Sequence, residues 1–147
     1  MANLVYNNFK EGLLVGSYKL STGQASTTPI FIALVSNSYT ADPDTHIYHS
    51  SLTNIVTPSN FTASFALSSP LVTQDDTGNQ GVLDGSDILM ANVTFGTTVR
   101  AAVLFASSGL GSASDPLIAY VDFTTDQAVT AGTFQITWAA AGILALT

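Results

Sequence analysis

Residues 99–106 read VRAAVLFA, and residues 117–123 read LIAYVDF. Both runs are mostly apolar and are separated by a segment of turn-forming residues, so they predict an antiparallel pair of strands at the centre of a sheet. In the first run every second residue from Val99 to Phe105 places an apolar side chain on one face, and on the other face only Arg100 is charged. A strand that is apolar on both faces must be covered on both, by a second sheet, a helix or another subunit.

The composition indicates one domain with a substantial core, spanning residues 1–147. Charged residues make up only 9% of the chain and the net charge is −7. The basic residues are Lys10, Lys19 and Arg100, too few for a nucleic-acid-binding surface, so no nucleic-acid partner is expected. The weak charge is compatible with burial against neighbouring proteins and equally with a small, neutral, Thr-rich β-protein.

The chain contains no cysteine, which excludes disulfides, thiolate nucleophiles and cysteine-ligated metals. The first residues lack the basic-then-apolar order of a secretion signal. No apolar run approaches the roughly 20 residues that a membrane-spanning helix needs. We therefore expect no membrane partner, and synthesis and retention in the cytoplasm of the producing cell.

Residues 3–15 predict a short helix that docks on the sheet. Val5, Phe9 and Leu13 recur at intervals of four and so form one apolar stripe. Asn3 is placed to cap the start, and Gly16 stands where helices commonly end.

The remaining pattern is that of short strands separated by turns. Residues 61–68 alternate apolar and polar side chains, which predicts a half-buried strand. Residues 46–52 are compatible with a short helix or an irregular segment, and residues 139–142 with a bulge or a bend. The expected fold is mainly β, a single-domain antiparallel β-sandwich that is jelly-roll-like. Further strands are predicted at residues 17–20, 30–35, 71–73, 81–83, 88–95 and 133–138, and residues 143–146 are expected to close the chain inside the fold.

The densest group of polar, metal-ligating side chains is Asp42, Asp44, His46 and His49. Two carboxylates and two imidazoles within eight residues have a spacing that suits a metal site. The Asp-Pro-Asp sequence is also a common turn, and a histidine near aromatic residues often only completes a hydrogen bond in the core. The turn is the favoured interpretation, so we expect no metal ion and no cofactor.

No other group of residues in the sequence predicts a metal-binding or catalytic site. Residues 75–79 begin like a calcium-binding loop, but the twelfth position is Ser86 where an EF-hand requires Glu, so a hairpin turn is favoured. The sequence has no Gly-x-Ser-x-Gly nucleophile elbow. Glu11 lies beside Lys10 on the predicted helix and is expected to face solvent.

Several stretches resemble a family of small virion proteins of tailed bacteriophages. The resemblance extends over nearly the whole chain and is weakest between residues 60 and 95. Its motifs are structural, so the resemblance assigns no functional residue. It is carried by MANLVYNNFK at 1–10, DTHIY at 44–48 after Tyr39-Thr40, PLIAYVDF at 116–123, Gln127, VTAG at 129–132, Phe134, Ile136, Trp138 and GIL at 142–144.

The resemblance implies a non-enzymatic structural protein of the virion, made in the host cytoplasm. We expect a capsid decoration or cement protein, because such proteins act through contact area and a surface rich in Ser, Thr and Ala suits this role. The expected partners are the major capsid protein and further copies of the chain, with a trimer suggested by analogy alone.

Two alternative functions remain at this point. One is a tail or head–tail connector component. The other is a receptor- or glycan-binding fibre module, for which Tyr39, Tyr48 and Trp138 are the candidate aromatic contacts. The alternation of Trp138 with Phe134 and Ile136 instead predicts that Trp138 lies in the core.

Overall fold

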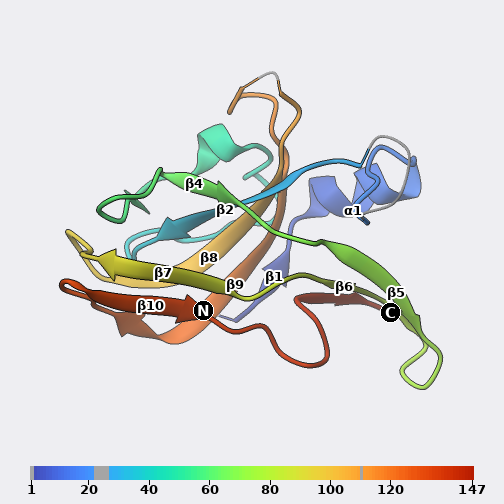
Figure 1. The fold of residues 1–147 in the computed structure, drawn as a ribbon. Helices are drawn as coiled ribbons and strands as arrows, with labels where there is room; N and C mark the ends of the chain where they lie inside the picture. The colour runs from blue at the N-terminus through green and yellow to red at the C-terminus, as the bar shows by residue number, and fades with distance from the viewer. Residues whose placement is uncertain (1, 22–26, 110) are drawn as a thin grey trace.

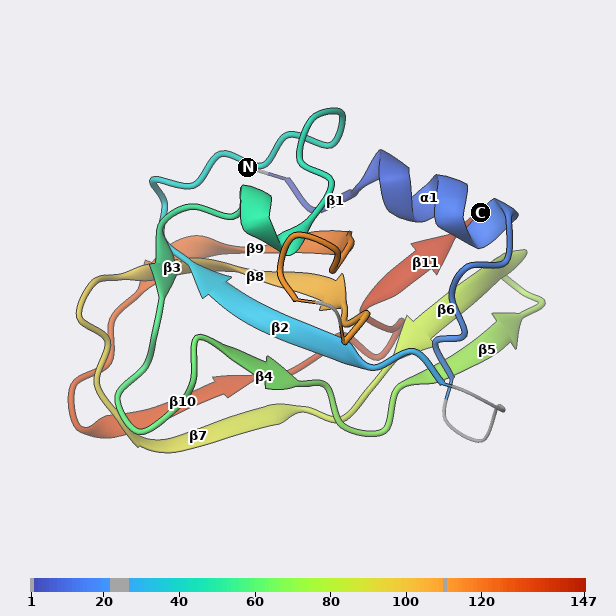
Figure 2. The same ribbon diagram turned by 90° about the horizontal axis from the view of Figure 1, so that it is seen from above.

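The computed structural model describes residues 2–21, 27–109 and 111–147. In these ranges the protein is mainly β, with antiparallel sheets and one short α-helix, α1 (Asn7–Leu14), near the N-terminus (Figure 1). Two smaller sheets pack against one face of a larger sheet (Figure 2), which gives a sandwich-like arrangement. The predicted fold class is confirmed.

The larger sheet contains the predicted central pair of strands. Its strands are β1 (Leu4–Val5), β2 (Ile30–Val35), β3 (Ile55–Val56), β4 (Ser64–Ala66), β8 (Val99–Ala106) and β9 (Leu117–Gln127). Their order is β1-β9-β8-β2-β3, and β4 also pairs with β2. Val103 of β8 lies opposite Tyr120 of β9, as expected for the antiparallel pair. β2 and β8 have the predicted bounds, and β9 continues beyond its predicted end at residue 123.

The second layer is a long, bent ribbon. It consists of β5 (Leu71–Asp75), β6 (Gln80–Asp84), β7 (Ile88–Val93), β10 (Gly132–Ile136) and β11 (Leu144–Leu146). β10 pairs with β7, and β11 pairs with β6, which also pairs with β5. Between these pairs the chain bends at residues 139–142, as predicted. A Cβ on Gly142, whose φ is +92°, would lie 2.3 Å from Val82 Cγ1, so the bend requires glycine.

Both faces of β8 are covered, as its sequence requires. On one face Leu104 packs in a core cluster with Met90 and Phe134 of the second layer. On the other face Phe105 belongs to a second cluster. It is covered there by residues of the loop between β2 and β3, including Tyr39, and by Tyr6, which precedes α1. A loop and the residue before the helix therefore cover the face for which a sheet, helix or subunit was expected.

Two features of β8 do not follow from a strict alternation of its side chains between the two faces of the sheet. Val99 lies in the cluster between the layers, because the register of β8 against β9 shifts between Val99 and Ala101. Arg100 donates from Nε to Asp122 Oδ1 at 2.6 Å and from Nη2 to Oδ2 at 3.3 Å. This paired hydrogen bonding holds the pKa of Asp122 well below its usual range and compensates the one charge on the strand.

Helix α1 is shorter than the predicted 3–15. Its expected first turn forms β1 instead, and the predicted cap Asn3 accepts the backbone N–H of Asp122 through Oδ1 at 2.8 Å. At the other end the prediction is confirmed: Gly16 has φ +74°, and its N–H donates to the Leu13 carbonyl at 3.1 Å. Such a left-handed glycine ends the helix without strain.

Three other predictions were wrong. The strand predicted at 61–68 is confined to β4, and Phe61 is 36% exposed. Residues 17–20 are not a strand. The segment 143–146 does not close inside the fold, because Leu146 is 37% exposed. The ambiguous segment 46–52 contains a short 3-10 helix, η1 (His49–Ser51).

Candidate functional site

The two carboxylates considered as metal ligands, those of Asp42 and Asp44, accept hydrogen bonds that hold a turn of the chain. Asp42 accepts the backbone N–H of Asp44 at 2.9 Å and the hydroxyl of Thr45 at 2.7 Å. These bonds lower the pKa of the Asp42 carboxyl. Asp44 accepts the side-chain amide of Asn7 at 2.6 Å and so ties this turn to the first residue of α1. The Asp-Pro-Asp sequence therefore forms the predicted turn.

The two histidines have different neighbours. His46 Nδ1 lies 2.9 Å from the Tyr39 hydroxyl. The ring centroid of His49 lies 4.4 Å from that of Phe105, and burial lowers the pKa of the His49 imidazole. Across the described ranges, no three His, Asp or Glu side chains come together in a group that could hold a metal ion.

The three candidate sugar-binding aromatics do not share a surface. Tyr39 is only 2% exposed, and Trp138 is 9% exposed with its indole N–H donating to the Ser86 carbonyl at 3.0 Å. The prediction that Trp138 lies in the core is confirmed. Tyr48 is exposed.

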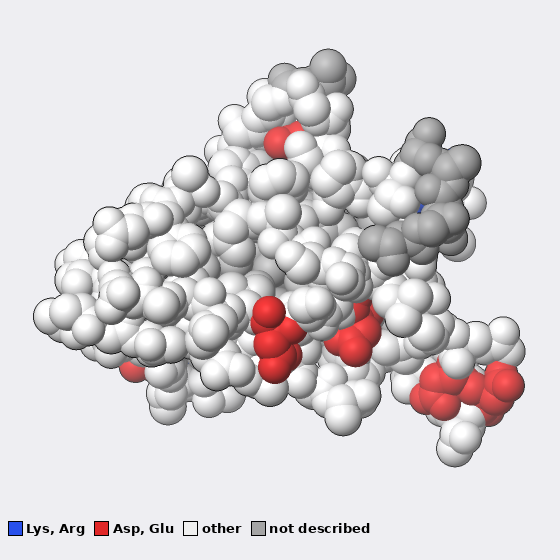
Figure 3. Space-filling view, viewed as in Figure 1, with Lys and Arg blue, Asp and Glu red and all other residues white. Residues whose placement is uncertain are grey.

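The predicted turn at residues 75–79 is the tip of the β5–β6 hairpin. Asp75 Oδ1 accepts the backbone N–H groups of Thr77 and Gly78, each at 3.0 Å. Its Oδ2 accepts the side-chain amide of Gln80 at 2.8 Å. The hairpin extends beyond the body of the protein (Figure 1), and acidic side chains gather at its tip, with further acidic side chains elsewhere on the same face (Figure 3).

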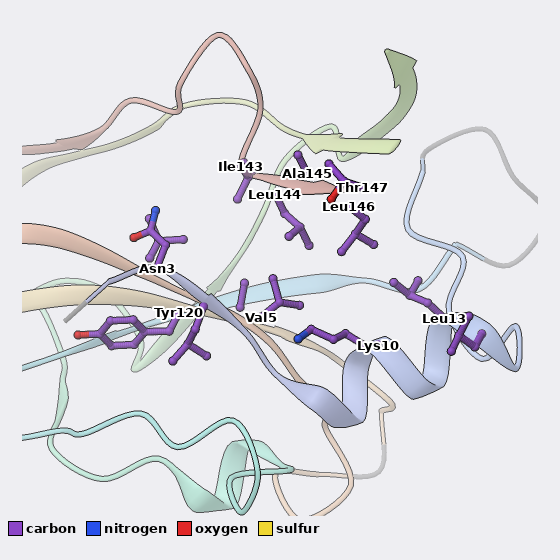
Figure 4. A pocket seen from close by; sticks show the side chains of 14 residues that line it. Asn3, Val5, Lys10, Leu13, Tyr120, Ile143, Leu144, Ala145, Leu146 and Thr147 are labelled. Carbon is purple, nitrogen blue, oxygen red and sulfur yellow. The ribbon is translucent and has the colours of Figure 1, made fainter. Parts of the chain in front are cut away.

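An open groove of about 680 Å³ lies between α1 and β1 on one side and β11 on the other. In the close view Leu13 and Lys10 of α1 face Leu144 and Leu146 of β11 across it (Figure 4). Its lining is largely aliphatic, and Lys10 is its basic side chain. Glu11 is exposed, as predicted.

Exposed aliphatic side chains gather around this groove, and we call them the apolar end surface. Leu14 lines the groove together with Leu146, and Leu146 lines a neighbouring hollow together with Val72. Leu14 is 89% exposed, so its side chain contributes almost none of the free energy that a buried leucine gives to folding. The members of the apolar end surface are Leu14, Val72 and Leu146. Val15 and Leu71, each next in sequence to a member, are exposed as well.

Sequence reasoning missed this surface. The stripe of Val5, Phe9 and Leu13 describes one face of the predicted helix, and Leu14 and Val15 lie outside that stripe. The run Leu13-Leu14-Val15 was the available signal, because three successive residues on a helix cannot all face one sheet.

Comparison with protein-family models, with curated proteins and with solved structures found no match to this chain. Within the described residues, no helix has the length and hydropathy needed to cross a membrane.

Proposed function

We propose that this chain is a non-enzymatic structural protein of a tailed-bacteriophage virion. Its role is that of a capsid decoration protein, which binds the major capsid protein, bridges neighbouring capsomers and stabilises the head. The sequence resemblance at residues 1–10, 44–48 and 116–144 supports the assignment to virion proteins.

The observation that carries a function through protein–protein contact, whether the partner is the capsid or another copy of the chain, is the apolar end surface. Leu14 is 89% exposed and Val72 is 43% exposed, although full burial of such a side chain contributes roughly 1.5–3 kcal/mol. A contiguous set of exposed aliphatic side chains is characteristic of surfaces that are covered by another protein. A protein that works through contact area needs such a surface and needs no reactive group.

The low charge fits the same role. With only 9% charged residues, most of the surface can be buried against a neighbour without leaving an unpaired charge in the interface. A protein that binds only the assembled head stabilises it by mass action, as a ligand stabilises a folded protein.

The test is immunogold labelling of intact virions with an antibody raised against this chain, combined with a count of its copies per virion by quantitative mass spectrometry. Label over the whole head at high copy number would support the decoration role. Label confined to the neck or tail at low copy number would replace it with a connector or fibre component. Absence of the chain from purified virions would overturn the proposal.

A further inference from the structure

The apolar end surface has charges of opposite sign at its two sides. Lys10 lies on the same face of α1 as Leu14, four residues along the helix, and both line the groove. On the far side, Asp75 and Asp76 line the hollow that Val72 and Leu146 also line. Leu146 borders both hollows and therefore occupies the middle of the surface.

Lys10 is available for a partner. Its ammonium group makes a 3.3 Å hydrogen bond to the side-chain oxygen of Asn7, which is neutral and exposed. Arg100, in contrast, is held by Asp122 and Asp126. Among the residues described, no ion pair involves Lys10, and Asp76 is hydrogen-bonded only to the side-chain amide of Gln74.

We propose that a second copy of this chain covers the apolar end surface in a twofold symmetric dimer. A surface that is positive on one side, apolar in the middle and negative on the other is complementary to itself after a half-turn. The half-turn places Lys10 of each copy against the β5–β6 hairpin tip of the other. Leu146 then lies close to the twofold axis, where the two apolar surfaces bury each other.

The edge of the second layer fits this arrangement. β11 pairs with β6 on one side, and its other edge, which borders the groove, pairs with no strand of the described segments. Edge strands of this kind pair readily with a strand from another chain, and antiparallel pairing of two identical strands is itself twofold symmetric. This contact joins two copies, whereas the trimer suggested by analogy would require a different interface. Because the dimer buries the apolar end surface, the contact with the capsid in the proposed function would use another part of the weakly charged surface.

The first experiment measures the mass of the purified chain by sedimentation velocity over a range of concentrations. The wild-type chain is expected to be a dimer. Lys10→Glu and Asp76→Lys each place like charges together twice per dimer and should each weaken dimerisation by roughly tenfold or more. The double variant Lys10→Glu/Asp76→Lys restores opposite charges and should dimerise within about threefold of wild type. Leu89→Asp, on the exposed face of β7, is the matched control and should leave the dimer unchanged.

The absence of cysteine from the chain allows a second, independent test. Leu146→Cys near a twofold axis should form a disulfide-linked dimer under mild oxidation and no larger species. Leu89→Cys should remain monomeric on a non-reducing gel. Circular dichroism spectra and melting temperatures confirm that each variant is folded.

Three results would overturn the dimer. These are a wild-type chain that is monomeric at high concentration, an assembly whose affinity is unchanged by both charge reversals, and a trimer that Leu146→Cys fails to cross-link. All measurements use the free protein in solution. Their failure would therefore leave the labelling test of the virion role untouched, and a failure of that role would leave the dimer standing.

Discussion

The hydroxyl oxygen of Tyr6 lies 3.0 Å from that of Tyr39, and both residues are buried on the face of the central sheet that the β2–β3 loop covers. The Tyr39 hydroxyl also lies 2.9 Å from His46 Nδ1, which accepts the backbone N–H of Asp42 at 3.3 Å. Because this nitrogen accepts, Tyr39 donates to it, and Tyr6 in turn donates to Tyr39. The chain of hydrogen bonds ties the residue before α1 to the loop.

The order of donation predicts different effects for two conservative substitutions. Tyr39→Phe leaves the buried Tyr6 hydroxyl without an acceptor and should destabilise the protein by about 1–3 kcal/mol. Tyr6→Phe leaves the Tyr39–His46 bond in place and should cost only about 0.5–1.5 kcal/mol. Urea unfolding of both variants and the double variant gives the coupling energy. The order of donation would be contradicted if the two single variants lost the same free energy of unfolding and the double variant lost the sum of the two.

The buried tyrosines predict that the protein loses stability at alkaline pH. Burial raises the pKa of the Tyr6, Tyr39 and Tyr120 phenols. In the unfolded chain these phenols lose their protons near pH 10, whereas the folded protein retains them, so stability should fall as pH rises above about 10. Phenolate absorbance and circular dichroism, followed together in a Tyr48→Phe variant that lacks the exposed phenol, should show the buried tyrosines ionising only as the protein unfolds. Ionisation that precedes unfolding would contradict this prediction.

His49 predicts a loss of stability on mild acidification. Burial lowers the pKa of its imidazole, and its Nε2 is buried without a hydrogen-bond partner among the described residues. Below about pH 6.5 the unfolded chain takes up a proton that the folded protein does not, so the free energy of unfolding should fall as pH decreases.

The matched variant is His49→Phe, which keeps a ring against Phe105 and removes the titrating group. It should be at least as stable as wild type at neutral pH and should lose the pH dependence between about 7 and 5. Urea unfolding at several pH values measures both. An unchanged slope in His49→Phe would assign the dependence to another group.

Replacing Gly12 by alanine should lower the stability of the protein, although Gly12 lies inside a helix. Alanine normally stabilises such a position by roughly 0.5–1 kcal/mol. Here a Cβ would lie 2.1 Å from Cε2 of Tyr18, whose ring stacks on Phe9 at a centroid distance of 5.2 Å. Gly12→Ala should therefore destabilise the protein by about 1–3 kcal/mol.

Thermal unfolding measures that change, and the Tyr18→Ala background provides its control. Without the ring the clash disappears, so adding Gly12→Ala to Tyr18→Ala should be neutral or stabilising. The same loss in both backgrounds would show that Tyr18 is not the cause.

The sequence by itself determined the strands whose pattern is local and strong. β2 and β8 have the predicted bounds because each is a continuous, mostly apolar run next to turn-forming residues, and β2 is in addition rich in β-branched residues. Gly16 ended the helix and residues 75–79 formed a turn because each depends only on neighbouring backbone groups. The burial of Trp138 followed from alternation with Phe134 and Ile136.

Tertiary structure alone decided the features that join distant parts of the chain. Leu4 and Val5 are a strand because β9 offers them an edge to pair with, which outweighs the helical spacing of their sequence. Asp44 pairs with Asn7, and His46 bonds to Tyr39, so the suspected ligand cluster is divided among separate contacts. The apolar end surface assembles from α1, β5 and β11, which are neighbours only in the folded chain. Local patterns specify which residues must be buried, and only packing specifies what buries them.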